Sequence, residues 1–90
     1  MLFREQMGPQ SVSATIPLAL PHPDVVRVTV HDADGRTIRT IFAGLLEAGA
    51  HRLGWDGLDA DGREIASGSY YLHVAGSAGE TSSRTLTVVR

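Results

Sequence analysis

Apolar and polar residues alternate along most of this chain, with the period of two that places successive side chains on opposite faces of a β-strand. Val26, Val28 and Val30 form one face of such a segment, whereas Arg27 and Thr29 fall on the other. β-Branched residues favour this pleated, half-buried setting. We expect strands at 12–20, 25–32, 36–42, 51–55, 70–74 and 84–90, with a short strand or an irregular link at 64–66.

Turn-forming residues separate these segments at short intervals. The sequence Asp-Ala-Asp-Gly at 32–35 fits a type I turn closed by a left-handed glycine, which predicts a hairpin between 25–32 and 36–42. The same five residues, Asp-Ala-Asp-Gly-Arg, occur at 32–36 and at 59–63. Their flanks do not align over a longer unit, so we interpret them as one kind of turn used twice. About seven strands with no helical periodicity predict an all-β fold, a small antiparallel β-sandwich.

Three places depart from simple alternation. Pro17 cannot donate a backbone hydrogen bond, so the first long strand should lie at a sheet edge or bend there. The spacing of Ile38 and Ile41 predicts a bulge near Thr40 or an early exit from the sheet. Residues 44–49 are too short and too glycine-bounded for a stable helix. We expect a loop there, with one of its two leucines tucked beneath it and the other in a small exposed apolar patch.

Length and composition bound the remaining possibilities. A chain of 90 residues with 42% hydrophobic and 20% charged residues has room for one small globular domain. The net charge of −2 and the scattered basic residues exclude a nucleic-acid-binding field, and without cysteine there is no disulfide framework. We see neither a signal peptide nor a membrane-spanning segment. We predict a tail or docking segment at 1–10 and a domain at 11–90; the tail is either a frayed terminus or an apolar tag that docks onto a partner.

Candidate chemistry has simpler explanations in the fold. The paired aspartates suggest calcium, but the bidentate glutamate of a calcium loop is replaced by Gly68 after one turn and by Ile41 after the other. Surface positions explain the four histidines, which show no ligand spacing. Trp55 shares a face with Leu53, which favours a core anchor over a sugar-stacking platform. We therefore predict no cofactor, no metal, no catalytic residues and no enzymatic activity.

Several short motifs together resemble a known family. They are a valine-rich strand, an Asp-x-x-Gly-Arg turn, Ala-Gly-x-His, Trp-Asp-Gly-x-Asp-x-x-Gly, a Gly-x-Tyr strand and a closing strand with a basic end, at 26–30, 32–36, 48–51, 55–62, 68–70 and 86–90. This set resembles the immunoglobulin-like domain of the flagellar hook-capping protein (FlgD type), a module also found at the C-terminus of secreted bacterial proteins. The resemblance implies an immunoglobulin or fibronectin type III-like sandwich without cofactor or enzymatic role.

The functional expectation is a structural or interaction module that acts as an accessory subunit or assembly domain of a larger bacterial complex. The alternatives are a module that binds carbohydrate or calcium and a C-terminal spacer or sorting domain of a secreted protein. The resemblance favours an extracytoplasmic location, in the periplasm, at the cell surface or in a flagellar-type assembly. We expect protein partners, no nucleic acid and no small-molecule ligand. The candidate partner contacts are Leu2, Phe3, Met7, Leu45 and Leu46.

Overall fold

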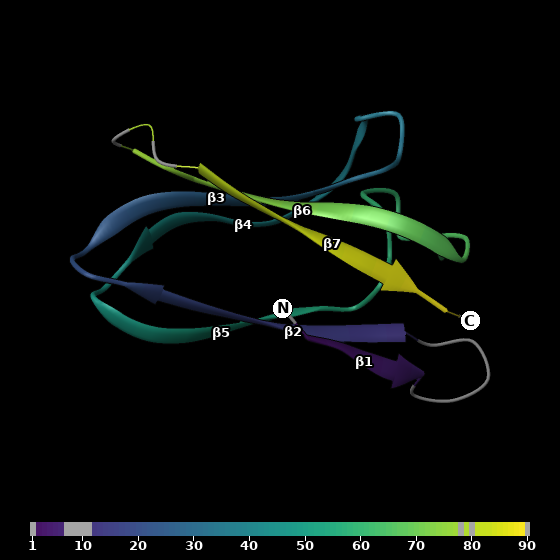
Figure 1. Ribbon diagram of the computed structural model, residues 1–90, viewed down its shortest axis with the longest axis horizontal. Helices are drawn as coiled ribbons and strands as arrows, with labels where there is room; N and C mark the ends of the chain where they lie inside the picture. The colour runs from purple at the N-terminus through teal and green to yellow at the C-terminus, as the bar shows by residue number, and fades with distance from the viewer. Residues whose placement is uncertain (1, 7–11, 78, 80, 90) are drawn as a thin grey trace.

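The computed structural model describes residues 2–6, 12–77, 79 and 81–89, and in these ranges the protein is all-β (Figure 1). A three-stranded sheet has the order β1-β2-β5 and a four-stranded sheet the order β4-β3-β6-β7. All neighbouring strands pair antiparallel. The strands are β1 (Leu2–Gln6), β2 (Val12–Leu20), β3 (Asp24–His31), β4 (Thr37–Leu46), β5 (Gly49–Trp55), β6 (Gly68–Gly76) and β7 (Thr81–Val88).

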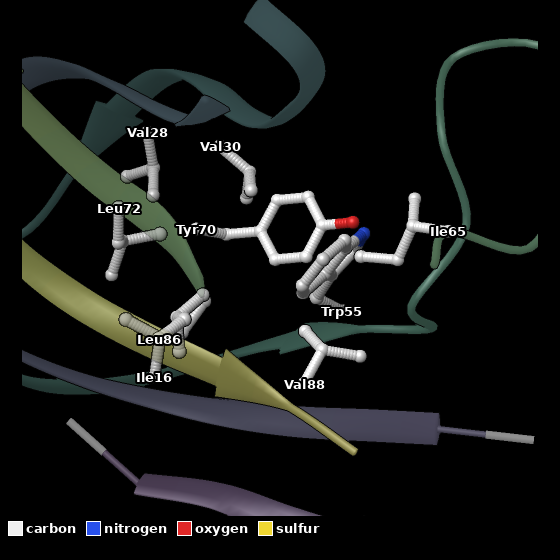
Figure 2. Close-up of a cluster of buried hydrophobic side chains, with 9 residues drawn as sticks. All are labelled: Ile16, Val28, Val30, Trp55, Ile65, Tyr70, Leu72, Leu86 and Val88. Carbon is white, nitrogen blue, oxygen red and sulfur yellow. The ribbon is translucent and has the colours of Figure 1, made fainter. Parts of the chain in front are cut away.

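The hydrophobic core lies between the two sheets, as Figure 2 shows. Trp55, at the end of β5, and Tyr70, near the start of β6, bring aromatic rings from the two layers together. Trp55 is only 3% exposed, which confirms its predicted role as a core anchor. Full burial of one large apolar side chain contributes about 1.5–3 kcal/mol. The cluster consists of Ile16, Val28, Val30, Trp55, Ile65, Tyr70, Leu72, Leu86 and Val88.

The predicted hairpin between 25–32 and 36–42 is confirmed, because β3 and β4 pair antiparallel around the turn at residues 32–36. The predicted bulge near Thr40 is also present. Val28 pairs with Phe42 while Thr29 pairs with Thr40, which leaves Ile41 as the extra residue. A second register shift leaves out Ile38 in the same way. Both unpaired isoleucines pack against the core, so the bulges bring to the core apolar residues that strict alternation would not.

The loop expected at 44–49 is wrong. Strand β4 continues to Leu46, which pairs with Asp24, and β5 already begins at Gly49. Pairing with β3 holds this segment extended despite its glycines. Gly44 has a φ of 157°, a backbone conformation that residues with a side chain rarely adopt, so glycine suits this position of the strand. Only residues 47 and 48 remain to carry the chain from one sheet to the other.

Strand β2 is a middle strand, in contrast to the edge position expected from Pro17. The middle position of β2 and the presence of Pro17 are nevertheless compatible. Strand β1 pairs with β2 as far as Thr15, whereas β5 continues on the other side through Pro17 to Leu20. Pro17 therefore lies where the described residues give β2 a single neighbour.

The N-terminal segment includes part of a sheet. The backbone of Leu2–Gln6, within the segment expected to be a tail, pairs with β2 as strand β1. The boundary between residues 10 and 11 falls outside the described residues and stays a prediction. At the other end, β7 spans Thr81–Val88, so it begins and ends earlier than the strand expected at 84–90.

Candidate protein-interaction surface

Two aliphatic side chains lie exposed next to each other at one end of the four-stranded sheet. Val25 of β3 and Leu45 of β4 are direct cross-strand partners, 55% and 61% exposed. The alternation of β3 puts Val25 on the outer face, because Val26 on the opposite face is buried. Single exposed apolar residues are ordinary on a protein surface, whereas an adjacent pair can mark a contact site.

Smaller residues extend this exposed pair along the outer face. Arg27 pairs with Ala43 on one side and with Ala75 on the other, one row further along the sheet than Val25 and Leu45. A shallow groove of about 250 Å³ is lined by Val25, Arg27, Ala43 and Ala75 but not by Leu45. We call the set Val25, Arg27, Ala43, Leu45 and Ala75 the outer patch. It combines two exposed aliphatic side chains with one exposed cation on a hydrogen-bonded sheet.

A buried carboxylate holds the backbone next to the outer patch. Asp24, 8% exposed, begins β3, and its Oδ1 accepts hydrogen bonds from the hydroxyl and the backbone N–H of Ser77, the latter at 3.3 Å. The Ser77 hydroxyl is the main reason that the pKa of Asp24 lies below its usual 3.8, and desolvation opposes this effect. The contact links the start of β3 to the residue that follows β6. Two of the three strands that carry the patch, β3 and β6, are thus linked at this end.

The rest of the outer face near the β3–β4 turn is polar. The ring of His31 contacts the hydroxyl of Thr29 through Nε2 at 2.8 Å and the hydroxyl of Thr37 through Nδ1 at 3.1 Å. His73 of β6 meets His31 edge to face, with ring centroids 6.0 Å apart. Across β3 and β6, His31 pairs with Tyr71 and His73 pairs with Thr29, and all four lie on the outer face. The predicted outer positions of His31 and His73 are therefore confirmed. These imidazoles take part in the hydrogen bonding of the sheet surface.

The structure does not bring the predicted contact residues together. Leu45 lies in the outer patch, but its neighbour Leu46 points to the opposite face and is half-buried. Leu2 and Phe3 belong to β1 in the other sheet, and Met7 lies outside the described residues. Sequence reasoning missed Val25. A signal was available, because Val25 and Val26 put apolar residues on both faces at the start of one strand.

Residues proposed for a ligand-binding alternative have structural roles. The Trp55 ring lies in the core and its Nε1–H donates to the carbonyl of Leu58 at 3.0 Å, so it offers no face for stacking on a sugar. The Oδ1 atoms of Asp32 and Asp59 each accept two backbone N–H groups of their own turns. Across the described ranges, no group of three or more metal-ligating side chains is found.

Comparison with known proteins identifies the family. The family model for the FlgD Ig-like domain matches residues 6–80. This chain belongs to the FlgD Ig-like domain family. Over 74 residues, 79% of the chain, it is 40% identical to the basal-body rod modification protein FlgD of Salmonella typhimurium. It is 41% identical over 58 residues to the Escherichia coli protein of the same name, a match covering 64% of this chain and 25% of that protein. The predicted resemblance is therefore confirmed.

A solved structure agrees with the sequence matches. The crystal structure of FlgD from P. aeruginosa superimposes with a TM-score of 0.67 at 30% sequence identity, covering 83% of this chain and 59% of that one. The present chain spans about a third of the length of the Salmonella relative, 32%. No helix that could cross a membrane occurs among the residues that the structure describes.

Proposed function

We propose that this protein is a non-enzymatic structural module of the FlgD type, with an immunoglobulin or fibronectin type III-like sandwich, that joins a larger extracytoplasmic bacterial assembly as an accessory or assembly domain. The family match over residues 6–80 carries this proposal. The named relatives are basal-body rod modification proteins, so a flagellar-type assembly is the setting that we infer.

The polar contacts of the described residues support a structural role. Asp32 and Asp59 close turns, and Arg39 joins β4 to the link that follows β5 through Asp56 at 3.0 Å. Asp24 fastens the start of β3. Each of these charged groups stabilises a connection between elements, as expected of a module whose task is to hold a shape.

We infer that the outer patch is where a protein partner contacts this module. Its two exposed aliphatic side chains lie on a hydrogen-bonded sheet and would be the centre of a small interface, with Arg27 at its rim. Full burial of a wholly exposed Val or Leu side chain contributes about 1.5–3 kcal/mol, and since Val25 and Leu45 are already partly covered, each would add roughly half of that. A contribution of this size matters within a multivalent assembly.

A chimera tests both parts of the proposal. The segment of Salmonella FlgD that matches this chain is replaced by the present domain, and swimming in soft agar and hook formation by electron microscopy are scored in a strain lacking its own FlgD. We expect the chimera to restore swimming. Val25→Glu combined with Leu45→Glu should abolish it, because two charges would have to be buried in the contact.

Tyr71→Glu is the matched control, since Tyr71 is 42% exposed on the same outer face but lies outside the outer patch. It should swim like the unaltered chimera. Melting of the isolated domains by circular dichroism confirms that all variants fold. A folded chimera that forms no hooks would contradict the proposed module function. A Val25→Glu/Leu45→Glu chimera that swims normally would contradict the assignment of the patch alone.

A further inference from the structure

The edges of the two sheets differ in how open they are to another strand. Strand β4 is interrupted by two bulges, and the pairing of the short strand β1 shifts register between Phe3 and Gln6. Strand β5 contains Gly49 and Gly54. Bulges and short length are usual protections of sheet edges, and glycine weakens the strand that contains it. Strand β7 comes close to β1 of the other sheet, but it pairs with β6 over Thr81–Val88 without a shift and contains neither proline nor glycine.

An open cavity of about 190 Å³, lined by apolar side chains and by Asp24, lies between the sheets beside the first half of β7. Its walls include Leu18 and Leu20 of β2, Val26 and Val74 of the four-stranded sheet, and Thr81 and Ser82 of β7. An apolar cavity of about 150 Å³ admits a molecule of the size of benzene. This space can therefore accept one branched or aromatic side chain.

Strand β2, on the opposite wall of this opening, is poorly suited to accept a strand. In the described part of the chain, residues 17–20 pair with β5 alone, but Pro17 has no N–H to donate. Strand β7 has no such interruption, so a strand that enters the opening would hydrogen-bond to β7. Figure 1 shows β7 at the margin of its sheet, in the layer opposite β2.

Two arginines add a charge preference to the same opening. Arg52 of β5 and Arg84 of β7 line an adjoining hollow of about 310 Å³ together with Pro17, Leu18 and Ala19. Both side chains are exposed. The salt bridges found among the described residues involve Arg36 and Arg39 instead. An incoming segment with an acidic side chain would complement this pair of cations.

We propose that the β7 edge binds an extended segment of a partner protein as an added strand. One apolar side chain of that segment enters the cavity beneath Leu18 and Leu20, and an acidic side chain pairs with Arg84 and Arg52. Main-chain hydrogen bonds supply affinity in this mode, and pockets for alternate side chains supply specificity. The inference goes beyond the proposed module function and does not depend on the outer patch.

The first test uses a synthetic peptide of about ten residues, the length of a long strand, with alternating valine and threonine and one central glutamate. A second peptide replaces the glutamate with lysine. Amide shifts and hydrogen exchange of the ¹⁵N-labelled protein are followed by NMR during titration. We expect shifts and slowed exchange centred on residues 81–85 with the glutamate peptide.

Arg84→Glu should weaken binding of the glutamate peptide about tenfold and strengthen binding of the lysine peptide, as reversal of one close charge pair predicts. Arg27→Glu is the matched control, because it changes a cation in the outer patch and should leave peptide binding unchanged. Equal binding of both peptides to the unaltered protein would overturn the proposed pairing of an acidic side chain with Arg84 and Arg52.

If the free peptide binds too weakly, the same glutamate strand is fused behind Arg90 through a flexible Gly/Ser linker. Linkage raises the effective concentration of the strand to about the millimolar range. The fused strand should slow amide exchange at 81–85 and raise the melting temperature, whereas a linker ending in a scrambled, proline-containing strand should not. If neither peptide nor fusion protects β7, the proposal is wrong. Protection of β7 by self-association without peptide would also overturn it, because the occupant would then be a second copy of the chain.

Discussion

The two Asp-Ala-Asp-Gly-Arg segments adopt one local structure in two different surroundings. In both, Oδ1 of the first aspartate accepts N–H groups from the residues two and four positions later, at 2.9–3.0 Å. In both, the glycine N–H donates to the carbonyl of that aspartate at 3.0 Å. Gly35 and Gly62 have φ angles of 86° and 82°. Five identical residues therefore give the same turn at both positions, which makes its conformation a local property.

The surroundings of the two turns differ. The first turn joins β3 and β4, which are neighbours in one sheet, whereas the second lies in the link from β5 to β6, which belong to different sheets. The second turn is tied to β4. The N–H of Ala60 donates to the carbonyl of Ile38 at 2.9 Å, and Arg39 Nη1 donates to Leu58 at 2.9 Å. The same five residues thus serve as a hairpin turn or as a docked connection, depending on the strands around them.

The largest expected loss of stability comes from substitution of Trp55, which precedes the second turn. No tryptophan precedes the first turn. Trp55→Ala leaves a large cavity in the core and removes the hydrogen bond to Leu58, so we expect a loss of about 3–5 kcal/mol in the free energy of unfolding. Urea denaturation measures it. Trp55→Phe, which keeps a ring in the core, should lose less. A loss below about 1 kcal/mol for Trp55→Ala would contradict the burial of the ring.

The next largest effect should distinguish Arg39 of β4 from Arg36 of the first turn in their contribution to stability. Arg39 donates to Asp56 and to Leu58 with its side chain 30% exposed, whereas Arg36 pairs with Asp32 at 3.5 Å with its side chain 81% exposed. Arg39→Met should cost about 1.5–3 kcal/mol through lost charged hydrogen bonds. Arg36→Met should cost less than about 1 kcal/mol, because water already screens that pair. Equal costs in urea denaturation would contradict the docking of the second turn through Arg39.

Substitution of Gly35 and of Gly62 should cost the same stability if the conformation of the turn is set by local interactions. Apart from the glycine and its two neighbours in the chain, no residue has an atom within 4 Å of a β-carbon built at Gly35 or Gly62, so alanine at either position meets only the strain of a positive φ. We expect Gly35→Ala and Gly62→Ala each to cost about 1–2 kcal/mol in thermal denaturation, equal within about 0.5 kcal/mol. A much larger cost at Gly62 would mean that docking on β4 also constrains the turn backbone.

The smallest expected effect is on the stability of the fold at acidic pH. The pKa of Asp59 lies below its usual 3.8, chiefly because the backbone N–H of Arg63 donates to its carboxylate. A carboxyl group with a lowered pKa in the folded state adds stability at neutral pH, and this contribution is lost as the pH falls through that pKa. Asp59→Asn keeps the turn acceptor but cannot titrate, so its unfolding midpoint should fall less than that of the unaltered protein between about pH 6 and about pH 3.

Asp61→Asn is the control for this experiment, since in the second turn Asp61 contributes its N–H to Asp59 and should retain the pH dependence of the unaltered protein. Asp24 also has a lowered pKa, held by Ser77, so part of the acid sensitivity should survive in Asp59→Asn. If the unfolding midpoint falls equally in Asp59→Asn and in the unaltered protein as the pH is lowered, Asp59 has no role in acid stability.

Local patterns predicted much of this fold because they depend on near neighbours in the chain. The alternation of valines gave the buried face of β3, and the spacing of the isoleucines gave the bulge at Ile41. The error at 44–49 has a different origin. Two glycines argue against regular structure, but pairing of Leu45 with Val25 and of Leu46 with Asp24 fixes the strand through residues some twenty positions away. Pairing over that separation does not appear in a local pattern.

The candidate surface was predicted only in part for the same reason. Leu45 was named from the sequence, but its partner Val25 becomes visible only when β3 and β4 lie side by side. The opening beside β7 was not predicted at all, since its walls come from β2, β3, β6 and β7 together. A cavity depends on how sheets pack, and packing is a property of the whole domain.

The sequence by itself determined the all-β class, both Asp-Ala-Asp-Gly-Arg turns, the core position of Trp55 and the membership of the FlgD Ig-like domain family, because each depends on residue types at short, fixed spacings. The tertiary structure decided which strands are neighbours, that β4 extends to Leu46, and that β7 is the last strand of its sheet. Backbone hydrogen bonds between strands are the physical reason, since every residue except proline offers the same donor and acceptor and only the burial of a common core selects which strands share them.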